Sequence, residues 1–188
     1  AIDVIVYHSA RDGVISSEAI LGSAVRNDGR SASLTAPNGQ AQQGVLDASL
    51  QVARLAAAEV GVLEAHGTGT ALGDPIEAGA VRAALIVPSL SRKLIMGSLK
   101  ANAGHTEPGA GLAGSLKLLM QLRDVVVSPN AQLRTINPHV LATLRGRAAC
   151  VLPVQVGILS TGEQQQSTAG SVSSFGYAGT IVHTALRS

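Results

Sequence analysis

The sequence predicts an α/β fold, a layered mixed sheet with helices on both faces. Two observations predict it. Strand-like and helix-like segments alternate along the chain, and the strands are apolar throughout rather than on alternate residues, so both of their sides need cover. With 188 residues, of which 46% are hydrophobic and 14% charged, the chain can form one domain with a large core. We therefore treat residues 1–188 as a single domain.

The first third of the chain predicts strands, one loop and one helix. Residues 2–8 and 19–25 are rich in β-branched or alternating apolar residues and predict strands, while 27–40 is polar, rich in glycine and predicts a loop. A helix starts near Asn38, and residues 61–65 form a short buried strand. The side of that helix expected to face the core carries Val45, Leu46, Ser49, Val52 and Ala53.

The middle of the chain predicts two helices around a strand. Residues 75–85 form a helix with Pro75 in its first turn and Asp74 as its cap, and residues 94–99 form a strand. A loop, KANAGHTEPGAG, follows this strand, and Thr106 and Pro108 open the next helix. The apolar stripe of that helix is expected to consist of Leu112, Leu116, Leu119 and Met120.

The last third predicts short elements and a hairpin. Residues 125–127 predict a strand and 138–144 a short helix, and the polar segment 160–170 predicts an exposed loop. Two final strands, 172–175 and 180–186, are joined by the turn sequence GYAG.

Composition excludes several classes of function. Tyr7, Phe175 and Tyr177 are the only aromatic residues and the net charge is +2, so the chain lacks both the stacking platforms and the basic surface that nucleic-acid binding needs. No apolar run is long enough to span a bilayer, and the N-terminus does not resemble a secretory signal. Because it lacks an initiator methionine, the chain resembles a segment or a processed piece. Cys150 is the single cysteine, which fits an intracellular, reducing compartment, either cytoplasm or plastid.

Three apolar strands end in glycine-rich loops that carry polar groups: VLEAHGTGT, LIMGSLKANAGH and SVSSFGYAGT. In open α/β sheets ligands bind at such strand ends, so the three loops are expected to converge on one site. His66 and His105 follow two of these strands and, if neutral, could polarise a carbonyl and stabilise an enolate or oxyanion. Each could instead be a hydrogen-bonded core histidine. Lys100 ends a buried strand where its ammonium needs a partner, or it is a solvated lysine at a loop start.

The remaining polar residues near these loops have less specific interpretations. Thr68 and Thr70 either hydrogen-bond a ligand chain or cap the loop locally. Asp74 and Glu77 fit a helix cap and a helix-dipole residue better than an acid/base pair. A metal site is not expected, because no third histidine or cysteine lies at a suitable spacing, although these two carboxylates remain possible ligands.

Four ordered stretches resemble the β-ketoacyl synthase family, in particular the ketosynthase domains of polyketide synthases. EAHGTGTALGDPIEA is similar to the family's histidine motif and GSLKANAGHTEPGAGLAG to its lysine–histidine motif, and SAVRNDGRSASLTAPNGQAQ and SVSSFGYAGT match two further stretches. The resemblance covers residues 15–186 and only the C-terminal half of a thiolase-like fold. It implies two similar halves in αβαβα layers and a decarboxylative Claisen condensation, for polyketide or fatty-acid synthesis, between a malonyl-carrier and an acyl group on a cysteine.

The resemblance assigns a role to each matching residue. His66 and His105 correspond to the catalytic histidines, Lys100 to the lysine that organises the site electrostatically, and Thr68 and Thr70 to the threonines that bind the phosphopantetheine arm. The backbone N–H of Tyr177 corresponds to an oxyanion-hole donor. No cofactor is expected on the chain itself, because phosphopantetheine arrives as the arm of an acyl carrier protein.

Departures from the family pattern leave two functions open. The nucleophilic cysteine belongs to the N-terminal half, Cys150 lies in an unrelated context, and Ile181 and Ala178 replace an asparagine and a glycine. The chain is therefore either the histidine-bearing part of a ketosynthase, completed by another half, or a ketosynthase-derived subunit with a structural role in a complex. Alone it should be inactive in condensation, and its low charge predicts that it forms oligomers or associates with other chains.

Overall fold

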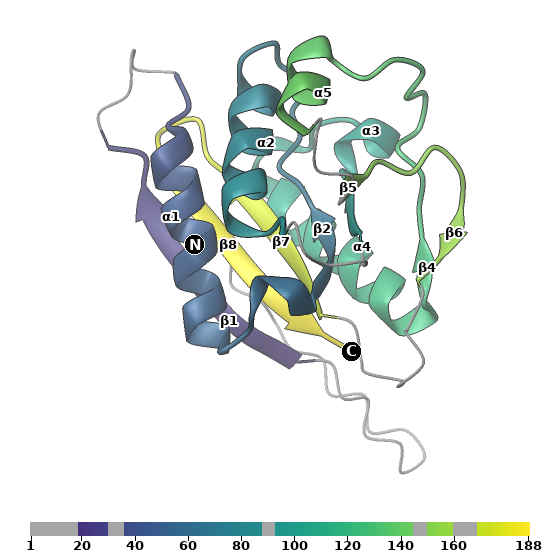
Figure 1. Cartoon of the computed structure of the whole chain (residues 1–188), viewed down its shortest axis with the longest axis horizontal. Coiled ribbons are helices and arrows are strands. Elements are labelled where there is room, and N and C mark those ends of the chain that lie inside the picture. The colour runs from purple at the N-terminus through teal and green to yellow at the C-terminus, as the bar shows by residue number, and fades with distance from the viewer. Residues whose placement is uncertain (1–18, 30–35, 88–92, 145–149, 160–168) are drawn as a thin grey trace.

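The computed structural model describes residues 19–29, 36–87, 93–144, 150–159 and 169–188. The strand predicted over residues 2–8 and most of the loop predicted over 160–170 lie outside these residues. Within them the predicted alternation of strands and helices is confirmed (Figure 1).

A six-stranded mixed sheet forms the centre of the fold, in the order β1-β8-β7-β2-β3-β5. β2 runs parallel to β3 and β7, and β3 runs parallel to β5, whereas β8 is antiparallel to both of its neighbours. A separate two-stranded pairing joins β4 to β6. The strands are β1 (Ala19–Asn27), β2 (Val60–Glu64), β3 (Leu94–Gly97), β4 (Val126–Val127), β5 (Cys150–Val151), β6 (Gly157–Ile158), β7 (Ala169–Phe175) and β8 (Thr180–Arg187).

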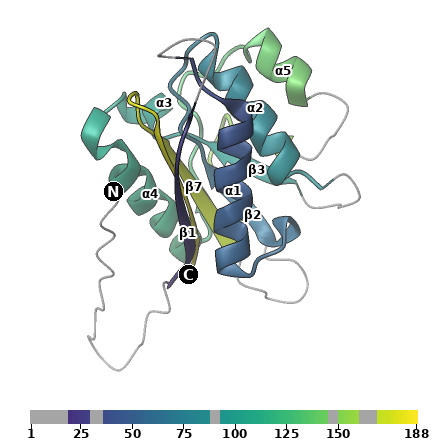
Figure 2. The same cartoon turned by 90° about the vertical axis from the view of Figure 1, so that its left-hand side faces the viewer.

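Helices cover both faces of this sheet, as the sequence predicts. Figure 2 shows α1 and α2 on one side and α4 on the other. The helices are α1 (Gly39–Ala53), α2 (Gly73–Ala84), α3 (Lys100–Ala103), α4 (Ala110–Asp124) and α5 (Pro138–Leu144), and short 3₁₀ turns precede β2 (Ala57–Glu59) and α4 (Glu107–Gly109).

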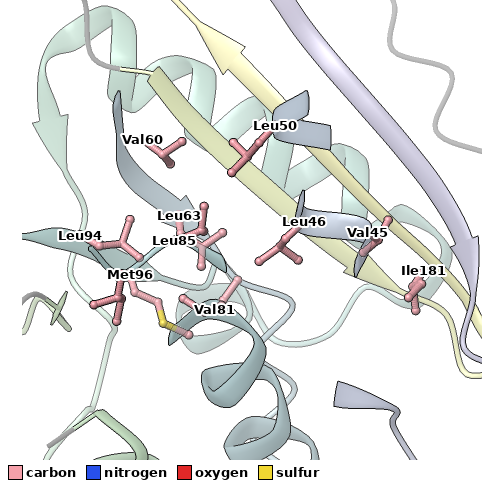
Figure 3. Close-up of a cluster of buried hydrophobic side chains, with 12 residues drawn as sticks. Val45, Leu46, Leu50, Val60, Leu63, Val81, Leu85, Leu94, Met96 and Ile181 are labelled. Carbon is pink, nitrogen blue, oxygen red and sulfur yellow. The ribbon is translucent and has the colours of Figure 1, made fainter. Parts of the chain in front are cut away.

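Each face of the sheet has its own hydrophobic core. The larger core lies between the sheet and α1 and α2, and Figure 3 shows its aliphatic side chains, among them Leu46, Leu63 and Val81. The smaller core lies under α4 and includes Val62, Leu118 and Val172. Since aromatic residues are almost absent, branched aliphatic side chains fill both.

The prediction for α1 is confirmed except at one residue. Asn38 is its N-cap, and the Asn38 side chain accepts hydrogen bonds from the Gln40 and Ala41 N–H groups. Val45, Leu46 and Ser49 are buried against the sheet, but Val52 is exposed.

The apolar stripe predicted for α4 is wrong. The structure exposes Leu112, Leu116 and Met120, and only Leu119 of the predicted stripe packs partly against the core. The buried side of α4 consists of Gly111, Gly114, Ser115, Leu118, Gln121 and Leu122. Small residues make this side suitable for close packing, because a Cβ added at Gly114 would lie 3.1 Å from the Glu64 Cγ.

Two predicted boundaries also need correction. β3 ends at Gly97 rather than at residue 99, and the first residues of the predicted KANAGH loop form α3. The Leu99 N–H donates to the Glu64 carboxylate instead of to a neighbouring strand, so the chain has left the sheet by this residue. Asp74 does not cap α2: it lies inside the first turn, and its carboxylate accepts from the Gly69 N–H.

Candidate active site

The three glycine-rich loops meet at one end of the sheet, where its parallel strands have their C-terminal ends. β2, β3 and β7 are adjacent parallel strands, so their C-terminal ends meet there, and His66 and Phe175 lie at two of those ends. A cavity of about 960 Å³ opens there. Its wall includes both predicted histidines, both predicted threonines and the turn after β7.

His66 is held in one orientation by the strand end opposite it. Its Nδ1 accepts a hydrogen bond from the Phe175 N–H at 3.3 Å, and the two rings lie 5.3 Å apart between centroids. Burial, together with the nearby Lys100 and His105, lowers the pKa of His66 to about 4. The imidazole is therefore neutral at pH 7, and because Nδ1 is the acceptor, Nε2 carries the proton.

His105 adopts a similar arrangement from the other loop. Its Nδ1 accepts from the Glu107 N–H at 3.0 Å, which likewise leaves the proton on Nε2. The two imidazole centroids lie 5.9 Å apart, with the rings nearly perpendicular. Unlike His66, His105 is exposed. The site thus presents two N–H donors close to each other.

Glu77 supports the loop of His66, a role the sequence did not predict. Its carboxylate oxygens accept from the His66 N–H at 2.8 Å and the Gly67 N–H at 2.9 Å. The Glu77 side chain is buried, and burial raises its pKa to about 7 against the effect of these two bonds. Gly67 has φ +45°, and a Cβ added there would lie 2.8 Å from the Ser98 Cβ, so this loop requires glycine. Glu77 thus holds the His66 loop in place through two hydrogen bonds, whereas the sequence suggested an interaction with the helix dipole.

Lys100 lies half-buried at the start of α3, close enough to two buried carboxylates to interact with their charges. Burial lowers its pKa, and the charges of Glu77 and Glu64 oppose that shift. Among the described residues it forms no ion pair within 4 Å. Its ammonium instead acts through space, and it contributes to the lowered pKa of His66.

Glu64 and Lys117 form a buried ion pair that ties both motif loops to α4. The Lys117 Nζ donates to the Glu64 Oε2 at 2.5 Å, while the Glu64 Oε1 accepts from the Leu99 N–H at 2.5 Å. Burial raises the pKa of Glu64 and the Lys117 ammonium opposes the rise. The sequence-based prediction missed this pair, although a glutamate at the end of a fully apolar strand signals a buried charge that needs a partner.

The two threonines line the cavity, and one of them also makes a local hydrogen bond to the backbone of its own loop, at the start of α2. Their hydroxyl oxygens are 3.4 Å apart, and the Thr70 Oγ1 accepts from the Gly73 N–H at 3.0 Å. The local bond at Thr70, one of the two alternatives, is therefore present, and both residues also line the cavity.

The turn after β7, Ile181 and Cys150 occupy three different positions in the fold. Tyr177 lies at the cavity wall with its side chain 84% exposed, and the turn is closed by bonds from Gly176 and Gly179. Ile181 is fully buried in the larger core and is not part of the cavity wall. Cys150 lies on β5 at the far edge of the sheet, where burial raises the pKa of its thiol to about 11.

The described part of the chain offers neither a metal cluster nor a membrane span. Across the described ranges, no three histidine, cysteine, aspartate or glutamate side chains cluster closely enough to hold a metal ion. None of the helices in the same ranges has the length and apolar character needed to cross a bilayer.

Comparison with known proteins confirms the resemblance inferred from the motifs. The model of the family "Beta-ketoacyl synthase, C-terminal domain" matches residues 18–134. A phenolphthiocerol/phthiocerol polyketide synthase protein of Mycobacterium tuberculosis is 43% identical over 179 residues, which cover 94% of this chain and 9% of the relative. The spectinabilin polyketide synthase system protein NorB of Streptomyces orinoci is 42% identical over 168 residues, covering 89% of this chain and 8% of the relative. The chain therefore corresponds to a small part of each of these large polyketide synthase proteins.

Solved structures support the thiolase-like fold. An oxazolomycin ketosynthase domain from Streptomyces albus superimposes with a TM-score of 0.79 at 31% identity, over 89% of this chain and 29% of that one. The ketosynthase from module 6 of the bacillaene synthase of Bacillus subtilis gives 0.80 at 28% identity, over 89% of this chain and 30% of that one. The chain thus matches a part of each ketosynthase.

Proposed function

Because this chain belongs to the β-ketoacyl synthase family, as its C-terminal domain, we propose that it supplies the histidine–lysine side of a decarboxylative condensing site. Under this proposal His66, His105 and Lys100 are the reactive groups, residues 1–188 are one domain, and a second half supplies the cysteine. The observation that carries the proposal is the pair of imidazoles 5.9 Å apart, each with Nδ1 occupied by a backbone N–H.

The proposed role of the two histidines follows from their tautomers. Both Nε2–H groups are available to donate to the thioester carbonyl oxygen of a malonyl-carrier. When the carboxylate leaves as CO₂, the electron pair of the breaking C–C bond forms an enolate, whose charge rests on that oxygen. Neutral donors suit this step, because they stabilise the enolate without transferring a proton that would quench it. Burial keeps His66 in this state at pH 7.

Condensation then requires a group that the chain does not supply. The enolate carbon attacks the carbonyl carbon of an acyl–cysteine thioester, and the resulting oxyanion is held by backbone N–H groups, that of Tyr177 among them. Collapse of the tetrahedral intermediate expels the cysteine thiolate and leaves a β-ketoacyl-carrier. Cys150 does not fit this role for two reasons. It lies on the outermost strand β5, beside the first residue of β3 and away from the strand ends that form the site. Its raised pKa also keeps it a thiol.

Lys100 and the two threonines complete the proposed site. The Lys100 ammonium helps keep His66 unprotonated and offsets the nearby carboxylates. Thr68 and Thr70 would hold the phosphopantetheine arm of an acyl carrier protein along the cavity wall, since their hydroxyl groups line it. That carrier is the substrate partner in this proposal.

A partner surface is available for the proposed second half. Leu112, Leu116 and Met120 are spaced four residues apart on α4, so they form one exposed apolar stripe. A large exposed apolar surface marks an interface. We assign the stripe to the half that carries the cysteine, because α4 begins next to the exposed His105 and a cover placed there also closes the site.

The test is reconstitution with a chain that carries a ketosynthase nucleophile motif. The pair should release CO₂ from a malonyl thioester, and His66→Ala or His105→Ala should each reduce the rate by at least about 100-fold, the scale seen when one oxyanion donor is removed. Decarboxylation that persists in the double variant would refute the assigned roles. His139→Ala is a matched control, because His139 lies in α5 and outside the cavity wall.

A non-catalytic role in assembly is the second candidate. It is favoured by the lack of any nucleophilic cysteine in the cavity wall together with the exposed stripe on α4. Copurification separates the two: a partner with a nucleophile motif favours catalysis, and partners from an unrelated assembly favour the structural role.

A further inference from the structure

Gln42 is a buried polar residue that the proposed mechanism does not use. It lies in the first turns of α1, is 3% exposed and forms part of the cavity wall. Its Oε1 has no hydrogen-bond partner in the structure. A buried amide oxygen without a partner is costly, so a ligand or water that donates to it would remove a penalty.

Asp28, which directly follows β1, adds a second buried acceptor oxygen without a partner. This oxygen is the Asp28 Oδ1, and Asp28 lines the same cavity. Asn38 connects the two residues: its Nδ2 donates to the Asp28 backbone carbonyl at 2.8 Å, and the Gln42 N–H donates to the Asn38 carbonyl at 2.9 Å. Asn38 and Gln42 therefore lie on the same side of α1, next to Asp28.

The chemistry of these atoms selects the kind of ligand group. Both are acceptors, and no buried donor that lacks a partner is found among the described residues of the cavity wall. An apolar acyl chain would leave both oxygens unsatisfied, whereas a hydroxyl or amide N–H group would satisfy one of them.

We propose that Gln42, assisted by Asp28, is a specificity-determining residue that accepts a hydrogen bond from a hydroxyl or N–H group of the bound thioester. The inference rests on the proposed function, since it takes the cavity to hold a carrier-linked acyl group. Two sources supply such a donor: a hydroxyl on the acyl chain, or an amide N–H of the phosphopantetheine arm.

The test measures binding of four probes to the 188-residue chain by NMR titration: pantetheine and the N-acetylcysteamine thioesters of butyric, 3-hydroxybutyric and 3-oxobutyric acid. Gln42→Leu should weaken binding of a donor-bearing probe about threefold to tenfold, the worth of one hydrogen bond. A loss confined to the 3-hydroxybutyryl thioester identifies the acyl hydroxyl as the donor. An equal loss for all four probes identifies the amide of the arm.

Gln40→Leu is the matched control, because Gln40 lies two residues away on α1 and is exposed. If Gln42→Leu binds every probe as Gln40→Leu does, the inference is wrong. A loss confined to the 3-oxobutyryl thioester, whose C3 oxygen only accepts, would also overturn it. Thr68→Val tests the proposed function separately: if it weakens all probes while Gln42→Leu weakens none, the proposed function stands and this inference fails. If no probe binds the wild-type chain, this inference is wrong, whereas the proposed function is decided by the reconstituted pair.

Stability provides a readout independent of the probes. If the Gln42 amide is kept for a ligand, its replacement by leucine removes a buried unsatisfied group and should raise the Tm of the ligand-free chain by about 2–4 °C. Gln40→Leu should leave Tm unchanged. A lower Tm in Gln42→Leu would show that the amide serves the fold and would contradict the proposal.

Discussion

α1 and α4 are both 15 residues long and pack on opposite faces of one sheet, but they differ in how many of their large apolar residues face the core. α1 directs Val45, Leu46 and Leu50 into the core. α4 packs through glycine and serine together with Leu118 and Leu122, and turns Leu112, Leu116 and Met120 outward. The contrast teaches that the sheet covers most of the large apolar residues of α1, whereas α4 leaves a row of them exposed, the row that we assign to the proposed second half. The following predictions would break or sharpen this contrast.

The largest effect is expected at the buried ion pair beneath α4. Lys117→Met leaves the Glu64 carboxylate buried without its counter-ion and should lower the free energy of unfolding by about 3–5 kcal/mol. Arg123→Met, in the same helix but in an exposed pair, should lower the free energy of unfolding far less. Urea denaturation measures both. Equal losses would mean that the inner side of α4 is not desolvated as described.

The same substitution in the two helices should have very different effects. Leu46→Ala removes a fully buried side chain and should cost about 2–5 kcal/mol. Leu116→Ala removes one that is 54% exposed and should change the stability of the chain by no more than about 0.5 kcal/mol. In a complex with the proposed second half, Leu116→Ala should instead weaken association. If its effect on the isolated chain equals that of Leu46→Ala, α4 is already covered.

The stability of the α1 face should depend on pH through His183. This histidine is fully buried and contacts the Ser173 hydroxyl. It lies two residues after Ile181 on β8, so both side chains are on the side of the strand that faces α1. Burial lowers the pKa of His183 from 6.5 to about 3. The unfolded chain therefore binds one more proton between these pH values, so this contribution is complete above pH 6.5 and is lost as pH falls toward 3.

Between pH 4 and 6 the free energy of unfolding should rise with pH by up to about 1.4 kcal/mol per pH unit because of His183. His183→Leu should remove this rise. His66, with a pKa of about 4, adds a slope of the same sign. Glu77, whose pKa is raised to about 7, opposes it from pH 4.5 upward, because the folded chain then binds the extra proton. Urea denaturation across this range in wild type and variant gives the slopes, and identical slopes would exclude His183 as their source.

The smallest effect concerns two glycines in the same two helices. A Cβ at Gly44 of α1 meets only the movable end of Arg26, so Gly44→Ala should stabilise the chain by about 0.5–1 kcal/mol. A Cβ at Gly114 of α4 meets the Glu64 Cγ, which the ion pair holds in place, so Gly114→Ala should be destabilising. Opposite signs in thermal denaturation support the contrast, and a stabilising Gly114→Ala would contradict it.

The two helices also show how far the sequence predicts the fold. For α1 the cap at Asn38 indicates where the helix begins, and Val45, Leu46 and Ser49 indicate its buried side, so both were predictable apart from the exposed Val52. For α4 periodicity identifies which leucines share a side, but not which side meets the sheet. Gly111, Gly114 and Ser115 carry no hydrophobic signal, although close packing selects them.

The candidate site was predictable in outline and not in its supports. Glycine-rich strand ends and the family motifs predicted that His66, His105 and Lys100 belong to one site, and the structure brings their loops together. Glu77 and Lys117 could not be assigned, because their partners depend on how α2 and α4 are aligned with β2. That alignment comes from tertiary packing, and nothing near these residues in the sequence specifies it.

The glycine and serine side of α4 has a consequence for tolerated variation. In the isolated chain, substitutions on the outer side of α4 should be as neutral as those at exposed positions of α1, such as Asp47. Once the outer side is covered, every turn of α4 faces a packed layer, with small residues required on one side and apolar ones on the other. A saturation library could be screened once for folding and once for assembly. In both screens α1 should reject substitutions on one side only. α4 should reject them on one side in the folding screen and on two sides in the assembly screen.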